Sequence, residues 1–136
     1  MEQKIMELSR PRTMRAVTAV TSVTAVTLPA EFAHLQEHTG WALATETTRN
    51  MRRHSASMEE IGAFADAMLG EVERIVPYLD AFGQQLPDEA RPLLWMLLSL
   101  AEVAPVLECY RQQAVIDGYD PRRFVADEDF VLKPAL

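Results

Sequence analysis

The apolar run Leu93–Leu107 constrains the fold more than any other part of this chain. Only Ser99 and Glu102 interrupt it. Pro87 and the acidic residues after it mark a helix start before the run, and Gly118 offers a stop after it. A helix that is apolar nearly all round must be buried nearly all round. The run therefore predicts a central, buried helix.

The clearest helix start is a capping box at Ser57 and Glu60, in which each side chain accepts a hydrogen bond from the other residue's backbone N–H. Apolar residues then recur from Ile61 to Leu79 at alternating steps of four and three. This spacing predicts one continuous apolar seam along a second helix. We expect Pro77 to kink its last turns and Gly83 to end it.

A third helix is predicted from Pro29 to the basic cluster at Arg49–Arg53. Proline suits the first turn of a helix, where its missing N–H costs nothing. Apolar residues recur at helical spacing between Phe32 and Leu43, and basic residues in a last turn suit the helix dipole. The chain is thus expected to form three long helices of about 25 residues each, roughly 37 Å in length.

These patterns predict an all-α protein with three long helices in a bundle completed by oligomerisation. Two amphipathic neighbours cannot cover a third helix that is apolar nearly all round, so the missing surface is expected from a second copy or another subunit. We therefore predict a helical homodimer, which aspartate at Leu97 or Leu100 should destroy. A length of 136 residues fits one core, and the bundle domain is assigned to residues 28–118.

Extended segments are expected on both sides of the bundle domain. Residues 1–27 are assigned to an N-terminal arm, extended or partly disordered. A repeated Val-Thr-Ala-Val-Thr sequence between Val17 and Thr27 favours extended backbone there through its β-branched residues. Residues 119–136 are assigned to an extended C-terminal segment that packs on the bundle or on a partner, because their apolar side chains lack helical spacing.

Composition excludes several functional classes. The formal net charge of −7 argues against nucleic-acid binding, which demands clustered Lys and Arg. No membrane interaction is expected, because Arg91 and Glu102 bracket the best apolar run before it reaches the ~20 residues of a spanning helix. The single cysteine, Cys109, fits a reducing compartment, so we expect a cytoplasmic protein.

Glu31, His34 and His38 form the sharpest candidate for a metal site. Their spacing places all three on one helix face, and two imidazoles one turn apart beside a carboxylate suit a divalent transition metal. The Glu-x-x-His spacing also suits a di-iron site, but no second copy occurs, so a homodimer would have to supply it. We favour ordinary surface roles for these histidines. No cofactor is therefore expected, and a divalent transition metal is the alternative.

A second candidate site is a ligand pocket lined by Trp95, Met96, Glu102 and Tyr110. Glu102 is the most notable carboxylate, because a buried glutamate usually needs a partner. A structural ion pair with Arg74 or Arg111 is the favoured interpretation. The alternative is an acid or base facing a pocket between helices.

The leading functional hypothesis is a noncatalytic interaction protein or accessory subunit that acts as a homodimer. It would bind partners, such as a larger protein, through its apolar central helix, its N-terminal arm and its C-terminal segment. One alternative is a small metal-binding protein or metalloenzyme that uses Glu31, His34 and His38. Another is a binder of a small apolar ligand between helices. The sequence contains no Gly-rich phosphate loop, zinc-ribbon spacing or nucleophile elbow, so no catalytic residue is assigned.

Overall fold

The computed structural model describes residues 25–123 and 126–129, and these residues form helices and no strands. The predicted all-α class is therefore confirmed for the described part of the chain. Its elements in order are η1 (Ala30–Trp41), α1 (Glu46–Ser55), α2 (Met58–Leu69), α3 (Val72–Asp80), α4 (Arg91–Pro105), η2 (Val106–Tyr110) and η3 (Pro121–Arg123). The elements η1 and η3 are 3-10 helices, and η2 is a turn of π-helix.

The helix predicted from Pro29 to Arg53 is divided into two elements. Pro29 does precede the first of them, the 3-10 helix η1. The chain leaves helical geometry after Trp41 and starts again at Thr45, whose extended backbone and side chain cap α1. The Thr45 hydroxyl accepts the backbone N–H of Thr48 at 3.2 Å. A local cap of this kind competes with a continuous helix, so the predicted length was wrong.

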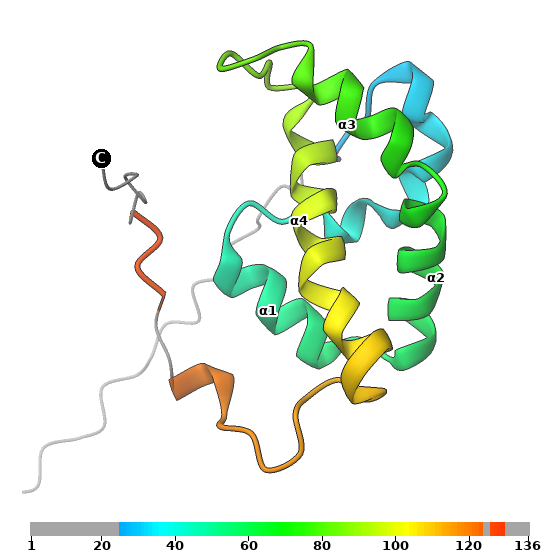
Figure 1. Cartoon of the computed structure of the whole chain (residues 1–136). Coiled ribbons are helices and arrows are strands. Elements are labelled where there is room, and N and C mark those ends of the chain that lie inside the picture. The colour runs from blue at the N-terminus through cyan, green and yellow to red at the C-terminus, as the bar shows by residue number, and fades with distance from the viewer. Residues whose placement is uncertain (1–24, 124–125, 130–136) are drawn as a thin grey trace, which may run out of the picture.

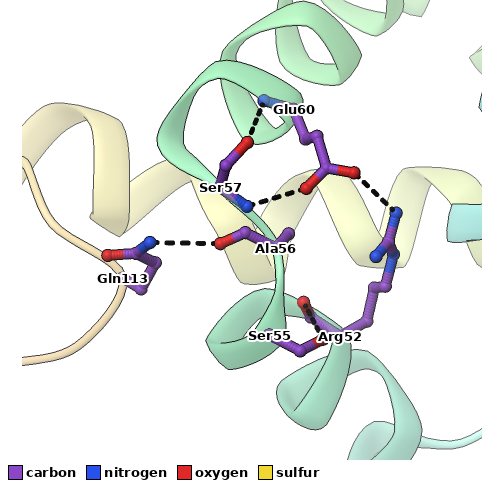
Figure 2. Close-up of polar contacts among 6 residues, drawn as sticks. All are labelled: Arg52, Ser55, Ala56, Ser57, Glu60 and Gln113. Carbon is purple, nitrogen blue, oxygen red and sulfur yellow. Dashed lines mark hydrogen bonds and ion pairs between the residues drawn. The ribbon is translucent and has the colours of Figure 1, made fainter.

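The capping box predicted at the start of α2 is confirmed. The Ser57 N–H donates to the Glu60 carboxylate at 2.8 Å, and the Glu60 N–H donates to the Ser57 hydroxyl at 3.1 Å (Figure 2). These hydrogen bonds lower the pKa of Glu60, chiefly through the Ser57 backbone N–H. The same junction receives the Gln113 side chain, which donates to the Ala56 carbonyl at 3.1 Å. The junction between α1 and α2 is thus fixed locally and from the end of the chain.

The helix predicted to continue to Gly83 is also divided. α2 ends at Leu69 and α3 begins at Val72. The two residues between them, Gly70 and Glu71, form the break. Pro77 lies inside α3. Gly83 has a φ of +57° just beyond α3, a conformation that glycine adopts without a Cβ penalty. The predicted stop is therefore confirmed, although the helix before it is two helices.

The central predicted helix is α4, and it continues into η2. After Pro105 the helix widens into π geometry, and it ends at Arg111 in the left-handed conformation with φ 53°. This end precedes the predicted stop at Gly118. The combined stretch Arg91–Tyr110 contains an 18-residue window with a mean hydropathy of 1.5, and it is long and apolar enough to cross a membrane by length and composition. The expectation that no run reaches that length was wrong. The core helix of a soluble protein meets the same criterion.

One apolar core joins all the long elements except α1. α4 contacts η1, α1, α2 and α3 and lies between α1 and α2 (Figure 1). Trp41 of η1 stacks on Phe64 of α2 with ring centroids 4.7 Å apart. The largest fully buried apolar side chains are Phe32, Phe64, Leu35, Ile61, Met68, Ile75, Leu93, Met96, Val103 and Val106. No residue of α1 is buried, and its Asn50 and Arg53 side chains contact Glu102 of α4.

The predicted terminal segments lie partly outside the described residues, which exclude 1–24, 124–125 and 130–136. The two residues Val26 and Leu28, which precede η1, are held by the side chain of Gln36 within η1. This side chain accepts the Leu28 N–H at 3.3 Å and donates to the Val26 carbonyl. In the predicted C-terminal segment, residues 121–123 form a short 3-10 helix rather than extended chain. Glu128 contacts α1, because its carboxylate accepts the Thr47 N–H at 3.1 Å.

Candidate functional site

The inward side of α4 is fully buried. Its buried residues recur at steps of three and four, the spacing of one stripe on a helix. All have 0% exposed area: Leu93, Met96, Ser99 and Val103. Ser99 is the buried polar residue among those the structure describes, and its hydroxyl donates to the Trp41 carbonyl at 2.6 Å. A buried hydroxyl needs such a partner. The inward side is therefore satisfied within the chain.

The opposite side of α4 is apolar and only partly covered by the described part of the chain. It consists of Leu94, Leu98, Ala101 and Pro105, which we name the outward α4 face. Leu94 is 36% exposed and Leu98 is 41% exposed, while Ala101 is exposed and Pro105 half-buried. At about 100° of rotation per residue, these positions point away from the buried stripe. Contiguous exposed apolar surface marks interaction sites, whereas single exposed apolar residues do not.

Opposite charges lie at the two ends of the outward α4 face. Arg91 is the first residue of α4, and its Nε lies 3.3 Å from a carboxylate oxygen of the exposed Asp88. Glu108, in η2, is exposed, and its side chain has no hydrogen bond or ion pair with the residues that the structure describes. Cys109 beside it is an exposed free thiol. The face is thus an apolar line with a cation at one end and an anion at the other.

Leu97 and Leu100, which the sequence suggested as dimer contacts, do not belong to the outward α4 face. Both are half-buried and pack against the chain's own core. Aspartate at either position would therefore disturb the fold of the chain itself. The exposed leucines of α4 are Leu94 and Leu98, and only the packing of α4 distinguishes them from their neighbours.

Glu102 pairs with Arg53 rather than with the predicted Arg74 or Arg111. Its Oε1 lies 2.9 Å from Arg53 Nε and accepts a hydrogen bond from the Asn50 side chain at 3.0 Å. The side chains of Arg53 and Glu102 are 12% and 22% exposed. The Arg53 contact is a charge contact, because the buried Nε–H does not align with any acceptor among the described residues. The predicted structural role of Glu102 is thus played with a different partner, which ties α1 to α4.

The four residues predicted to line a ligand pocket do not line the cavity that the described residues form beside α1. Met96 is fully buried in the core, and Tyr110 is 37% exposed on η2. The cavity, of about 470 Å³, lies between α1 and the chain after η2. Its lining includes Asn50, Met51, Arg53 and His54 from α1 and Val115 and Pro121 from the later segment.

Glu128 holds the end of the described chain against α1, beside this cavity. Its hydrogen bonds with Thr47 lower the pKa of the Glu128 carboxyl. Thr47 lies in the first turn of α1, where unpaired N–H groups favour an anion. Glu128 therefore supplies an acceptor for the Thr47 N–H, beside the Thr45 hydroxyl that accepts the Thr48 N–H. Thr47 and Glu128 are 81 positions apart in the chain, so no helical or strand spacing in the sequence predicts this contact.

Glu31, His34 and His38 are not gathered as metal ligands within one chain. His34 Nε2 lies 3.0 Å from the Glu71 carboxylate, and His38 Nε2 lies 3.6 Å from that of Glu37. Within residues 25–123 and 126–129, no three His, Cys, Asp or Glu side chains are grouped closely enough to hold a metal ion. Metal binding by these residues across a homodimer stays a prediction.

Comparisons with known proteins identify no relative. No protein-family model, no curated protein and no solved structure matches this chain.

Proposed function

We propose that this protein is a noncatalytic interaction protein that acts as a homodimer through the outward α4 face. The observation that carries the proposal is the exposure of Leu94 and Leu98 on a helix whose other side is fully buried. Covering each leucine would contribute roughly 1 to 2 kcal/mol. A second copy can cover both faces at once, because a two-fold interface uses the same surface on each subunit.

The experiment is a measurement of mass in solution by sedimentation velocity for three proteins. The wild-type chain should sediment as a dimer, and Leu98→Asp should sediment as a monomer, because a dimer would bury an unpaired carboxylate. Val76→Asp is the matched control. Val76 is 40% exposed and Leu98 is 41% exposed, but Val76 lies on α3 rather than on α4.

All three proteins should have the same helical circular dichroism, because both substituted side chains are exposed. A wild-type chain that remains monomeric at high concentration would contradict the proposed homodimer. A Leu98→Asp protein that still dimerises would place the interface on another surface.

The cavity beside α1 favours a second candidate function, the binding of a small ligand with an apolar body. Its volume of about 470 Å³ is within the range of small-molecule sites, and Met51 and Val115 line it together with the polar Asn50 and His54. An apolar fluorescent dye, anilinonaphthalene sulfonate, provides the test. Val115→Trp should abolish dye binding at the cavity, and Leu98→Asp should leave it unchanged. The reverse result would assign dye binding to the outward α4 face.

A further inference from the structure

The outward α4 face is preceded by Arg91 at the start of α4 and followed, three residues after Pro105, by Glu108 in the π turn η2. The sequence positions 91, 94, 98, 101, 105 and 108 alternate in steps of three and four, the spacing of a helix–helix contact seam. This line of positions extends roughly 25 Å at the α-helical rise of about 1.5 Å per residue. Its only charged members are the two at its ends. The line is therefore apolar in the middle and opposite in charge at its termini.

This charge distribution distinguishes the two ways in which a second copy could align with α4. In a parallel pair, Arg91 would lie beside Arg91 of the partner subunit and Glu108 beside Glu108 of the partner subunit. In an antiparallel pair, each arginine would lie at the same end as a glutamate. Like charges brought together oppose association, and opposite charges favour it. The line is thus complementary to itself only in the antiparallel direction.

Both end charges are available for a partner. The Arg91 and Asp88 side chains are 52% and 93% exposed, and a surface pair of this kind exchanges readily for a better one. Glu108 has no ion-pair partner within the described residues. The only charged side chain that α4 carries between them, that of Glu102, is occupied by Arg53 on α1.

Side-chain size agrees with the same direction. Antiparallel alignment of the two ends places the centre of the pair between Leu98 and Ala101. Leu98 then faces Ala101 of the partner subunit, and Leu94 faces Pro105 of the partner subunit. Each large side chain meets a small one, which lets two helices approach closely.

We infer that a second copy of this chain docks antiparallel on the outward α4 face, with the two-fold axis between Leu98 and Ala101 and Arg91 paired to Glu108 of the partner subunit. This arrangement rests on the proposed homodimer and specifies its geometry. Two ion pairs, one at each end, fix the direction and register of the contact.

Single-cysteine crosslinking in a Cys109→Ser background tests the direction. In the antiparallel pair, Ala101 lies about 5 Å along the axis from its symmetry mate, whereas Glu108 lies about 25 Å from its own. A disulfide needs Cα atoms within about 7 Å. Ala101→Cys should therefore form a disulfide-linked dimer on mild oxidation, and Glu108→Cys should not. An equal mixture of Arg91→Cys and Glu108→Cys chains should form a linked heterodimer.

Charge exchange tests the end pairs without a crosslink. Arg91→Glu and Glu108→Arg should each weaken the dimer about tenfold at low ionic strength, because each change places like charges together twice. The double variant Arg91→Glu/Glu108→Arg should restore wild-type affinity. Because these side chains are exposed, circular dichroism should be unchanged in all of them.

The outcomes separate this inference from the proposal on which it rests. A wild-type dimer in which Glu108→Cys links to itself would overturn the antiparallel direction and leave the homodimer standing. Failure of the double variant to recover affinity would overturn the end pairs. A wild-type monomer that floats with phosphatidylcholine vesicles would overturn both the inference and the homodimer, since the outward α4 face would then cover lipid.

Discussion

The two sides of α4 are similar in composition and opposite in environment. Leu93 and Leu94 are adjacent leucines in the same turn, yet Leu93 has no exposed area and Leu94 is 36% exposed. The inward side finds every partner it needs in η1, α1, α2 and α3. The outward side is only partly covered by the residues described, because Leu94 and Leu98 are 36% and 41% exposed. Apolar character alone therefore does not decide whether a residue supports the fold or an interaction. Substitutions on the two sides of α4 should change the free energy of unfolding by different amounts.

The largest difference should come from the two leucines. Leu93→Ala should lower the free energy of unfolding by about 2 to 5 kcal/mol, because it leaves a cavity in a packed core. Leu94→Ala should lower it by less than about 1 kcal/mol in the monomer, because its side chain is already partly hydrated. Urea unfolding at a concentration where both variants sediment as monomers measures this. Equal losses would contradict the division of α4 into two sides.

A smaller difference should separate the two glutamates near the end of the helix. Glu102→Ala removes the partner of a largely buried arginine and should cost about 1 to 3 kcal/mol, between the values of surface and fully buried pairs. Glu108→Ala should change monomer stability by no more than about 0.5 kcal/mol. Thermal unfolding of the two variants provides the comparison. Arg53→Met in the Glu102→Ala background should recover part of the loss, because it removes the uncompensated charge.

Substitutions at Ser99 and Ala101 should differ in their effect on the free energy of unfolding by less than those at the two glutamates. Ser99→Ala removes the hydroxyl that donates to the Trp41 carbonyl and should cost about 1 to 2 kcal/mol. Ala101→Ser adds a hydroxyl to an exposed position and should leave the monomer within about 0.5 kcal/mol of wild type. Urea midpoints report both values. A neutral Ser99→Ala variant would show that the hydrogen bond adds nothing to the inward side.

The smallest effect is expected from pH, and it should spare the outward α4 face. The pKa of Glu128 is lowered by its hydrogen bonds with Thr47 from the ordinary value of 4.5. Its contact with α1 is therefore fully present above that value and is lost as pH falls through the lowered pKa. The Thr47 amide resonance should shift in this acidic window, while the Leu98 methyl resonances stay constant. Glu128→Gln should abolish the shift, and an unaltered shift in that variant would exclude Glu128 as its cause.

Sequence reasoning succeeded where the determining contacts are local. The capping box at Ser57 and the stop at Gly83 depend on residues a few positions apart, and both are present. The break at Gly70 was missed because the apolar seam keeps its spacing across it. A bend of two residues does not change which side chains face the core. Helix continuity therefore cannot be inferred from periodicity alone.

That a second copy or another subunit covers the central helix stays a prediction, and the leucines named for that contact are not the exposed ones of α4. The sequence implied that the central helix needs cover from outside, but it selected Leu97 and Leu100 instead of Leu94 and Leu98. A helix that is apolar nearly all round carries no signal for its rotation about its own axis. That rotation is set by tertiary contacts such as the pair between Glu102 and Arg53, which lie far apart in the chain.

The position of Cys109 has a consequence for how the protein would respond to oxidants. In the antiparallel pair the two exposed thiols lie at opposite ends of the contact, too far apart to join each other. Oxidation would therefore link one dimer to the next and build chains of dimers, rather than lock a single pair. Such polymers would return to dimers on addition of a thiol reductant, because disulfide exchange is reversible. A reducing environment would then be a condition for a defined assembly.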